Sequence, residues 1–398
     1  MKALVIHARR TGLGIIRSLG IKGLTVYAAD TYAAPGFYSK YVTKSYLIPV
    51  EVAENDEVLL DSLLGIGAEN FSGEKIFLFT ASDNYLVFFA IHAIALSKFF
   101  NIVSETNIDF LKDSLLKEKM YQVAKRAGVD YPRTFYQDTI DLDCISYPVI
   151  VKPSIRKKNG FDFGLHVFKV KICRCHDELV SAVKLLKDHS FDFIVQEFIE
   201  GDDNQLYTIG VFSYKGSVVA SATGRKLRQF PPVTGECSYG ELVSAPELLH
   251  LAEKFLFQCG VTGICQLEFK KYNGKYYLME INPRPWSWIS LFEHAGVNLP
   301  YIACQKLNNP AETSTYLQTN FSGTWIFSLM EIKYHVFGTR RLGIFNFFVN
   351  FIFAKRHAYF DPRDIAPVIF ALYDFFRKPL SAWNHGSPSS LKTDLNKR

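Results

Sequence analysis

The sequence has no apolar run long enough to cross a bilayer. Its most apolar stretch, residues 344–354, is eleven residues long and interrupted by asparagine, whereas a membrane-spanning helix needs about 20 residues. We therefore expect no transmembrane segment. Residues 324–353 are rich in Phe and Ile and carry basic side chains, which leaves room for peripheral contact with a membrane or another protein. Packing of this segment against the rest of the protein is the simpler interpretation, and we favour it.

Cysteine is sparse and irregularly spaced. Seven cysteines are an odd number without a regular framework, which favours a reduced, cytoplasmic setting over a disulfide scaffold. The cluster Cys173-Arg174-Cys175-His176 does not have the spacing of a zinc knuckle, and the sequence has no second pair of Cys or His ligands to complete a zinc site with it. We expect these cysteines to be structural or incidental.

Neither sign of charge dominates. The 45 basic and 39 acidic residues leave a formal net charge of +6 and are spread along the chain, so nothing demands a nucleic-acid partner. With 398 residues, 48% of them hydrophobic, the chain can bury substantial cores and should form two or three domains. Composition thus indicates a globular protein. It does not fix the oligomeric state, and a homodimer is compatible with it.

A complete dinucleotide-binding fingerprint is also lacking. Gly12 and Gly14 follow the first apolar run, but Arg17 stands where the third glycine is required, so NAD binding is not favoured. Two further apolar runs, at 24–28 and 75–80, are each followed by residues typical of turns and helices. Strands that alternate with helices predict a small parallel sheet.

The strongest positive signal is a pair of aromatic-rich runs around Asn273-Gly274, which predicts two antiparallel strands and a tight turn. A two-residue loop would place Glu268 opposite Met279 and mix charged with apolar side chains. A three-residue loop with a bulge at Gly274 separates the faces, and we expect that register. The apolar face would carry Leu267, Phe269, Tyr277, Met279 and Ile281, and the polar face Gln266, Glu268, Lys270, Glu280 and Asn282.

Three oxygen ligands would converge on the polar face. Glu268, Glu280 and Asn282 supply two carboxylates and an amide oxygen, a donor set that suits Mg²⁺, with Mn²⁺ as an alternative ion. A half-exposed hairpin whose polar face meets only water would carry the same residue types. The hairpin alone leaves both interpretations open.

The residues that follow the hairpin favour the metal site. The string Glu280-Ile-Asn282-Pro-Arg284 resembles the E-x-N-x-R signature of the ATP-grasp superfamily, in which a further acidic ligand lies twelve residues upstream, as Glu268 does here. The longer string INPRPWSW, followed by LFEHAGVNLPY, resembles the predicted carboxylate-amine ligases of that superfamily, a group that includes D-aspartate ligase. The resemblance covers roughly residues 1–310.

The resemblance implies an α/β fold of the α+β ATP-grasp type. Residues 1–110 would form a Rossmann-like domain that precedes the ATP-grasp domain. Residues 111–310 would form the two-lobed ATP-grasp domain, with a flap lobe at about 133–195. An aromatic-rich helical extension would follow at 311–386 and a disordered tail at 387–398.

The resemblance also implies a nucleotide site. Lys152 ends an apolar strand, where burial without an anion such as an ATP phosphate would be unfavourable. Lys117 holds the family's position of a second phosphate-binding lysine, and Lys119 competes with it. The resemblance assigns adenine contacts to Gln196, Glu197 and Ile199 and a ribose contact to Asp203, with Asp202 and Asn204 as alternatives.

Two further basic segments complete the predicted site. Residues 154–164 resemble a mobile flap that closes over phosphates, with charge from Arg156, Lys157 and Lys158. The segment Gly224–Pro232 is expected to be an ordered basic loop facing the reaction centre, unless it is merely solvated; it carries Arg225, Lys226 and Arg228. We take Arg228 and Arg284 as candidate catalytic residues.

The implied function is an ATP-dependent ligase that joins a carboxylate, on an amino acid or peptide, to an amine through an acyl phosphate. Its products would be the amide, ADP and phosphate. The alternative is a non-catalytic nucleotide-binding module that recruits protein or membrane partners through its C-terminal aromatic segment. Glu280, Asn282 and Arg284 argue against that module, because binding alone does not need all three. The identity of the substrate pair is not encoded in a recognisable pattern.

Overall fold

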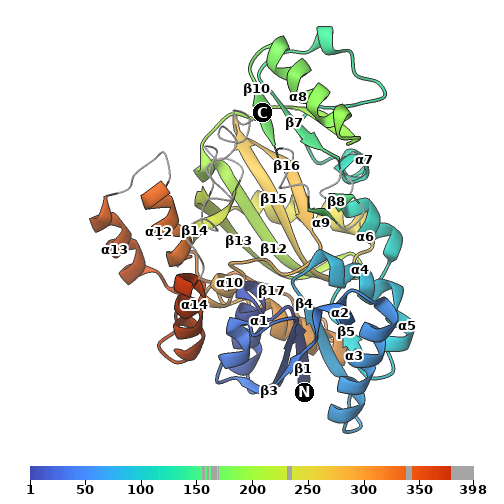
Figure 1. Cartoon of the computed structure of the whole chain (residues 1–398), viewed down its shortest axis with the longest axis vertical. Helices are drawn as coiled ribbons and strands as arrows, with labels where there is room; N and C mark the ends of the chain where they lie inside the picture. The colour runs from blue at the N-terminus through green and yellow to red at the C-terminus, as the bar shows by residue number, and fades with distance from the viewer. Residues whose placement is uncertain are drawn as a thin grey trace.

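A computed structural model gives the arrangement of the chain (Figure 1). The structure describes residues 1–115, 117–154, 157–158, 161–162, 168, 170–230, 235–337 and 343–377. Most of the predicted flap, including Arg156, lies outside these residues, as does the predicted tail at 387–398. Of Lys157 and Lys158 only the backbone is described.

A five-stranded parallel sheet forms the amino-terminal part of the protein, in the order β3-β2-β1-β4-β5. Its strands are β1 (Lys2–Ile6), β2 (Thr25–Asp30), β3 (Val42–Leu47), β4 (Ile76–Thr80) and β5 (Phe100–Ile102). Its main helices are α1 (Arg10–Gly20), α3 (Asp56–Asn70) and α4 (Asp83–Ile91). The predicted parallel sheet is confirmed. The two edge strands were not predicted, because β3 is half-exposed and β5 is only three residues long.

Helix α1 packs unusually close to β1. The helix begins at Arg10, so Gly12 lies inside its first turn, where an added Cβ would come within 2.4 Å of the His7 carbonyl oxygen. Arg17, which replaces the third glycine of a dinucleotide fingerprint, is buried and donates from Nε to Asp364 Oδ2 over 2.9 Å. Its Nη2 donates to the Tyr359 carbonyl oxygen over 2.7 Å. Arg17 therefore ties α1 to the C-terminal part of the chain.

A four-stranded antiparallel sheet forms a separate lobe at the top of Figure 1, in the order β10-β7-β11-β6. Its strands are β6 (Thr134–Tyr136), β7 (Val149–Pro153), β10 (Lys171–Cys173) and β11 (Phe193–Glu197), and α8 (His176–Asp188) covers one face. The short strands β8 (Lys157–Lys158) and β9 (Phe161–Asp162) pair with each other. Cys173 is buried beneath α8, whereas Cys175 is exposed.

The largest sheet lies between the amino-terminal sheet and this lobe, in the order β16-β15-β12-β13-β14-β18-β19, with β17 beside β13. Its long strands are β12 (Leu206–Tyr214), β13 (Ser217–Phe230), β14 (Glu236–Leu242), β15 (Gly263–Tyr272) and β16 (Lys275–Asn282). One face packs on α7 (Lys117–Ala127) and α9 (Pro246–Cys259). The other face packs on Trp286, Trp288 and the amino-terminal part, next to α10 (Ser290–His294) and α11 (Leu299–Asn308).

The hairpin β15–β16 differs from the predicted register. Asn273 and Gly274 have φ values of 49° and 78° and form a two-residue turn, with Tyr272 opposite Lys275. The extra residue is Met279 of β16. It lies between the pairs Glu268–Glu280 and Phe269–Leu278, where the register shifts by one residue. The prediction of a three-residue loop was therefore wrong. Tyr276 and Leu278, rather than Tyr277 and Met279, enter the core beneath α7 and α9.

The segment after residue 310 contains strands as well as helices, so the prediction of a helical extension was incomplete. Strands β17 (Tyr316–Leu317), β18 (Thr324–Ile326) and β19 (Arg356–His357) join the large sheet, and their two or three residues give little sequence signal. The helices are α12 (Ser328–Phe337), α13 (Ile344–Phe353) and α14 (Ala366–Arg377). Trp325 is buried within the sheet, whereas α13 has no buried residue. Within the described ranges, no helix is long and apolar enough to cross a bilayer.

Two glycines of the large sheet leave space for the rings of the two tryptophans that follow the hairpin. A Cβ on Gly210 would lie 2.0 Å from the Trp286 ring, and one on Gly224 would lie 2.7 Å from the Trp288 ring. Trp286 and Trp288 are almost fully buried and meet edge to face. These contacts fix the segment that carries Arg284.

We expect Gly210→Ala to destabilise the protein by about 1–3 kcal/mol, because the added methyl group has no space and Trp286 must move. Urea denaturation would measure the change in the free energy of unfolding. The matched control is Gly65→Ala in α3, where an added Cβ meets nothing within 4 Å and should be neutral or stabilising. Equal stability of Gly210→Ala and the wild type would contradict close packing of the Trp286 ring against Gly210.

Candidate active site

The polar face of the hairpin brings the predicted metal ligands together. In the observed register, Glu268 lies opposite Glu280, and Gln266 lies opposite Asn282. Asn282 Nδ2 donates to Gln266 Oε1 over 3.1 Å, and Gln266 Nε2 donates to Glu268 Oε1 over 2.9 Å. Two carboxylates and two amides therefore share one hydrogen-bonded face of β15 and β16.

Two lysine ammonium groups stand next to these carboxylates. Lys226 of β13 is 6% exposed and donates from Nζ to Glu268 Oε2 over 2.9 Å. Burial is the largest single influence and would lower the pKa of Lys226, but Glu268, Cys237 and Glu280 together outweigh it and the pKa is raised. Lys117 Nζ lies 3.7 Å from Glu280 Oε2, whereas Lys119 is exposed on the same helix. This geometry favours Lys117 over Lys119 as the lysine of the site.

The donor chemistry of this face fits a hard divalent cation. Its ligand atoms are carboxylate and amide oxygens, and both carboxylates lie beside positive charge. In the described parts of the chain, no three His, Cys, Asp or Glu side chains converge on a possible ion position. The Asn282 amide oxygen would therefore be needed as a third protein donor.

Lys152 is buried in the lobe formed by β6, β7, β10 and β11. Its Nζ donates to Gln196 Oε1 over 2.7 Å, and Gln196 Nε2 donates to Thr134 Oγ1 over 2.8 Å. Lys152 is 6% exposed and Gln196 is fully buried. The two residues predicted to meet the phosphates and the adenine thus contact each other across β7 and β11.

The other predicted nucleotide contacts follow β11. Glu197 is exposed, and its backbone N–H donates to the Arg133 carbonyl oxygen over 2.8 Å. Ile199 is buried. Asp203 Oδ2 accepts from the Gln229 backbone N–H, and its Oδ1 accepts from Gln229 Nε2, both over 3.0 Å. Asp203 therefore fixes the end of β13.

The predicted basic loop after Gly224 is a continuation of strand β13 as far as Phe230, which corrects the sequence-based expectation. The basic side chains of this segment have different partners. Lys226 donates to Glu268 of the hairpin, but Arg225 Nε donates to Glu241 Oε1 over 2.6 Å. Arg228 Nη2 donates over 2.7 Å to Glu331, a fully buried residue of α12. A catalytic role for Arg228 stays a prediction, and its observed contact is structural.

Arg284 connects the hairpin to the amino-terminal sheet. Its Nε donates to Asp83 Oδ1 over 2.5 Å, and its Nη2 donates to Asp83 Oδ2 over 3.2 Å. Asp83 begins α4, directly beyond the carboxyl end of β4. Burial is the largest single influence and would lower the pKa of Arg284, but Asp83, Glu280 and Glu236 together outweigh it and the pKa is raised. The guanidinium group is thus charged and held beside a carboxylate.

The sequence did not predict a group of polar residues at the carboxyl ends of the parallel strands. His7 follows β1, Asp30 ends β2 and Asp83 follows β4. Arg9 Nη2 lies 3.3 Å from Asp30 Oδ1. Ligands of open α/β sheets bind beyond the carboxyl ends of strands, where the strand order reverses direction, and here β1 and β4 flank that point.

His7 is the most constrained member of this group. Its φ is 67°, in the left-handed region that side chains other than glycine seldom adopt, and its Nδ1 is buried without a partner among the described residues. Burial, together with the nearby charge of Arg9 and Arg284, lowers its pKa to about 4. The imidazole is therefore neutral at pH 7.

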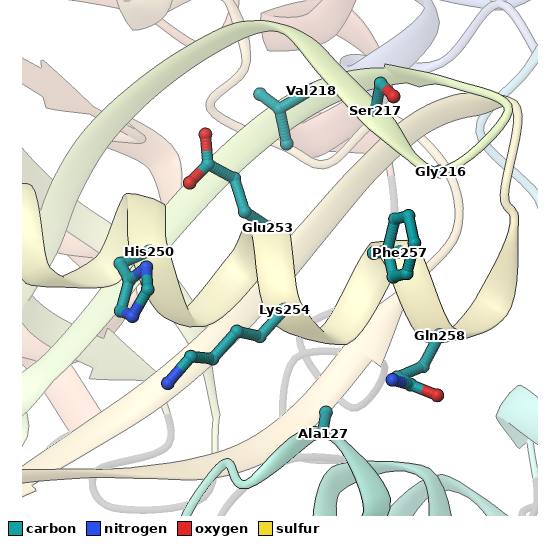
Figure 2. Close-up of a pocket in the computed structure, with 9 residues that line it drawn as sticks. All are labelled: Ala127, Gly216, Ser217, Val218, His250, Glu253, Lys254, Phe257 and Gln258. Atoms are coloured by element: carbon teal, nitrogen blue, oxygen red, sulfur yellow. The ribbon is translucent and has the colours of Figure 1, made fainter.

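A hollow of about 520 Å³ lies elsewhere, against α9 (Figure 2). Figure 2 shows His250, Glu253, Lys254 and Phe257 on α9, with Ala127 at the end of α7 across from them. None of the residues that line it belongs to the predicted site. The hollow lies on the α9 face of the large sheet, whereas Glu268, Glu280 and Lys226 lie on the other.

The family described as "ATP-grasp in the biosynthetic pathway with Ter operon" matches residues 189–327. D-aspartate ligase of Enterococcus faecium is 24% identical to the chain over 318 residues, which cover 73% of this chain and 72% of the ligase. The matched family segment includes β11 to β18 and therefore the whole hairpin with Arg284.

Solved structures share the fold. L-amino acid ligase from Bacillus licheniformis has a TM-score of 0.57 at 20% identity, covering 78% of this chain and 74% of that one. The biotin carboxylase domain of Hydrogenobacter thermophilus 2-oxoglutarate carboxylase, a dimer in complex with MgADP, ADP and bicarbonate, has a TM-score of 0.59 at 20% identity. That match covers 81% of this chain and 73% of the domain. The predicted α/β fold of the ATP-grasp type is confirmed.

Proposed function

Because this chain belongs to the ATP-grasp superfamily, we propose that it is a ligase that uses ATP to join a carboxylate to an amine. The products would be an amide, ADP and phosphate. The observation that carries the proposal is the convergence of Glu268, Glu280 and Asn282 on one face, with Arg284 two residues further on. A module that only binds nucleotide does not require this arrangement.

Glu268, Glu280 and Asn282 would hold Mg²⁺, with Mn²⁺ as an alternative ion. When bound, the ion would supply positive charge that offsets the phosphate charge during phosphoryl transfer. Lys226 and Lys117 already lie beside the two carboxylates. Their ammonium groups would add positive charge on the same face as the three oxygen ligands.

The nucleotide would lie between the small lobe and the large sheet. Lys152 and Lys117 would add fixed positive charge to the phosphates. Gln196, Glu197 and Ile199 would contact the adenine along the end of β11, and Asp203 would accept from the ribose hydroxyls. Gln196 already fixes the Lys152 ammonium group over 2.7 Å, so the adenine and phosphate contacts would be positioned by one hydrogen-bond chain.

The substrates to be joined would occupy the space beyond the carboxyl ends of β1, β2 and β4. Arg284 would orient the carboxylate and stabilise the oxyanion that forms when the amine attacks the acyl phosphate. Asp30 supplies an acceptor for an ammonium group, and Arg9 supplies a second guanidinium group. Alternating charges of this kind suit zwitterionic substrates, such as amino acids or short peptides.

The test of the function is a screen of amino-acid and carboxylate pools for stimulated ADP release, followed by isotope transfer. With ¹⁸O in the carboxylate, an acyl-phosphate mechanism passes one labelled oxygen into inorganic phosphate. Amide formation without label in the phosphate would contradict the proposed mechanism. Nucleotide binding without turnover of any pool would instead support the non-catalytic module.

We expect Lys152→Ala to weaken ATP binding by roughly 1.5–3 kcal/mol, the scale of a charge-assisted hydrogen bond. Isothermal titration calorimetry would measure the affinity, and thermal melting would verify that the variant is folded. Lys184→Ala is the matched control, because it removes an exposed lysine of α8 in the same lobe. Unchanged affinity in Lys152→Ala would make the lysine a structural partner of Gln196 only.

A further inference from the structure

Helix α13 lies at the edge of the molecule (Figure 1), and its outer apolar side chains are exposed to solvent. Between 53% and 75% of the surface of each of its outer apolar side chains is exposed, namely Ile344, Phe345, Phe348, Ile352 and Phe353. Ile344, Phe348 and Ile352 are spaced four residues apart and thus lie on one side of the helix. Residues 343–354 include no charged side chain. Soluble monomers seldom expose a continuous apolar face of this kind.

A second exposed apolar row lies on α14, the next helix along the chain. Its members again recur with helical spacing and are Ile365, Ile369, Leu372, Tyr373 and Phe376, between 38% and 73% exposed. The opposite side of α14 is anchored, because Phe370 stacks on Tyr38 at 4.4 Å and Ala371 is buried. The outer row is therefore held in place and turned away from the protein core.

Positive charge borders both rows. Lys355 and Arg356 directly follow α13, and Arg377 ends α14. In the sequence, Arg340 and Arg341 precede α13 and Lys378 follows Arg377. Residues 338–378 include only three acidic side chains, Asp361, Asp364 and Asp374. Each pairs with an arginine of this chain, namely Arg363, Arg17 and Arg377. Residues 338–378 carry seven Lys and Arg against these three Asp, and Glu293 pairs with Arg356 over 3.5 Å, so the net charge that this surface offers to a partner is still positive.

We propose that α13 and α14 dock the protein on an anionic membrane surface. An uncharged Phe- and Ile-rich helix bordered by basic residues is typical of helices that lie in the lipid headgroup region. Ten residues of α helix measure about 15 Å, half of the roughly 30 Å hydrocarbon core, so α13 lies along the surface instead of crossing it. A protein partner would have to offer an apolar groove with acidic rims, whereas anionic lipid supplies both features without a specific shape.

The test is flotation of the full chain with vesicles of phosphatidylcholine alone and of phosphatidylcholine mixed with phosphatidylglycerol. We expect the protein to float with the mixed vesicles and to remain largely free with the neutral ones. Phe348→Glu/Ile352→Glu should lower the partition coefficient by about tenfold or more, because it places negative charge in the apolar row. Both side chains are exposed, so the variant should melt at the wild-type temperature.

The matched control is Ile94→Glu, which adds the same charge at a 92% exposed isoleucine of α5 (Ala93–Leu96), in the amino-terminal part. It should float as the wild type does. Equal flotation of the double variant and the wild type would overturn the proposal, as would binding that ignores lipid charge. Self-association that the double variant abolishes, with no vesicle binding, would overturn it in favour of a second copy of this chain.

Discussion

Glu280→Gln is expected to remove nearly all ATP turnover while it leaves the fold intact. The substitution keeps the size of the side chain but removes one of only two carboxylates on the hairpin face. If the divalent ion contributes several kcal/mol to the barrier, turnover should fall by about a thousandfold or more. The fold should survive, because the ion pair of Glu280 with Lys117 is long and partly exposed, and such pairs add little stability.

ADP release measured across a range of Mg²⁺ concentrations checks this expectation. Glu253→Gln on α9 is the matched control, since it removes an exposed carboxylate on the opposite side of the large sheet. The control should behave as the wild type. Wild-type turnover in Glu280→Gln, with the same dependence on Mg²⁺, would remove Glu280 from the proposed metal site.

The local alternation of the hairpin made its polar face predictable. Side chains on a strand alternate with period two, so Glu268 and Gln266 had to share a face, as had Glu280 and Asn282. The turn was not predictable from the same pattern. Asn273-Gly274 adopts the two-residue turn that its φ angles permit, and the irregularity near Glu268 lets Leu278 reach the core under α7 and α9. Packing from distant helices decided that register.

Contacts between distant segments were beyond the sequence patterns. His7, Asp30 and Asp83 are neighbours only because β2, β1 and β4 are adjacent in the sheet, and strand order is not written in any one strand. The pairing of Arg17 with Asp364 spans 347 positions of the chain. By contrast, α9 was predictable because Pro246 and Gly260 mark its ends, and Gly260 has the expected positive φ of 64°. Local signals therefore predicted the polar face of the hairpin. The group of residues at the carboxyl ends of β1, β2 and β4 depends on tertiary packing.

Arg284→Ala is expected to keep ATP affinity within a few fold and to lower amide formation by about a hundredfold or more, the usual effect of losing one oxyanion donor. Arg284 follows the proposed metal ligands and pairs with Asp83 at the start of α4, whereas Lys152 pairs with Gln196 in the small lobe. Its loss should therefore act on the carboxylate and not on the nucleotide. Calorimetry with ATP and initial rates of amide formation separate the two effects.

The variant Asp83→Asn distinguishes a catalytic Arg284 from one that only ties the hairpin to α4. Asp83 is the observed partner of the guanidinium group, so both substitutions break the same ion pair. If the ion pair only holds the two parts together, Asp83→Asn and Arg284→Ala should reduce amide formation equally. If Arg284 acts on the reacting carboxylate, Asp83→Asn leaves that group in place and should retain far more activity than Arg284→Ala. Equal losses would therefore assign Arg284 to positioning alone.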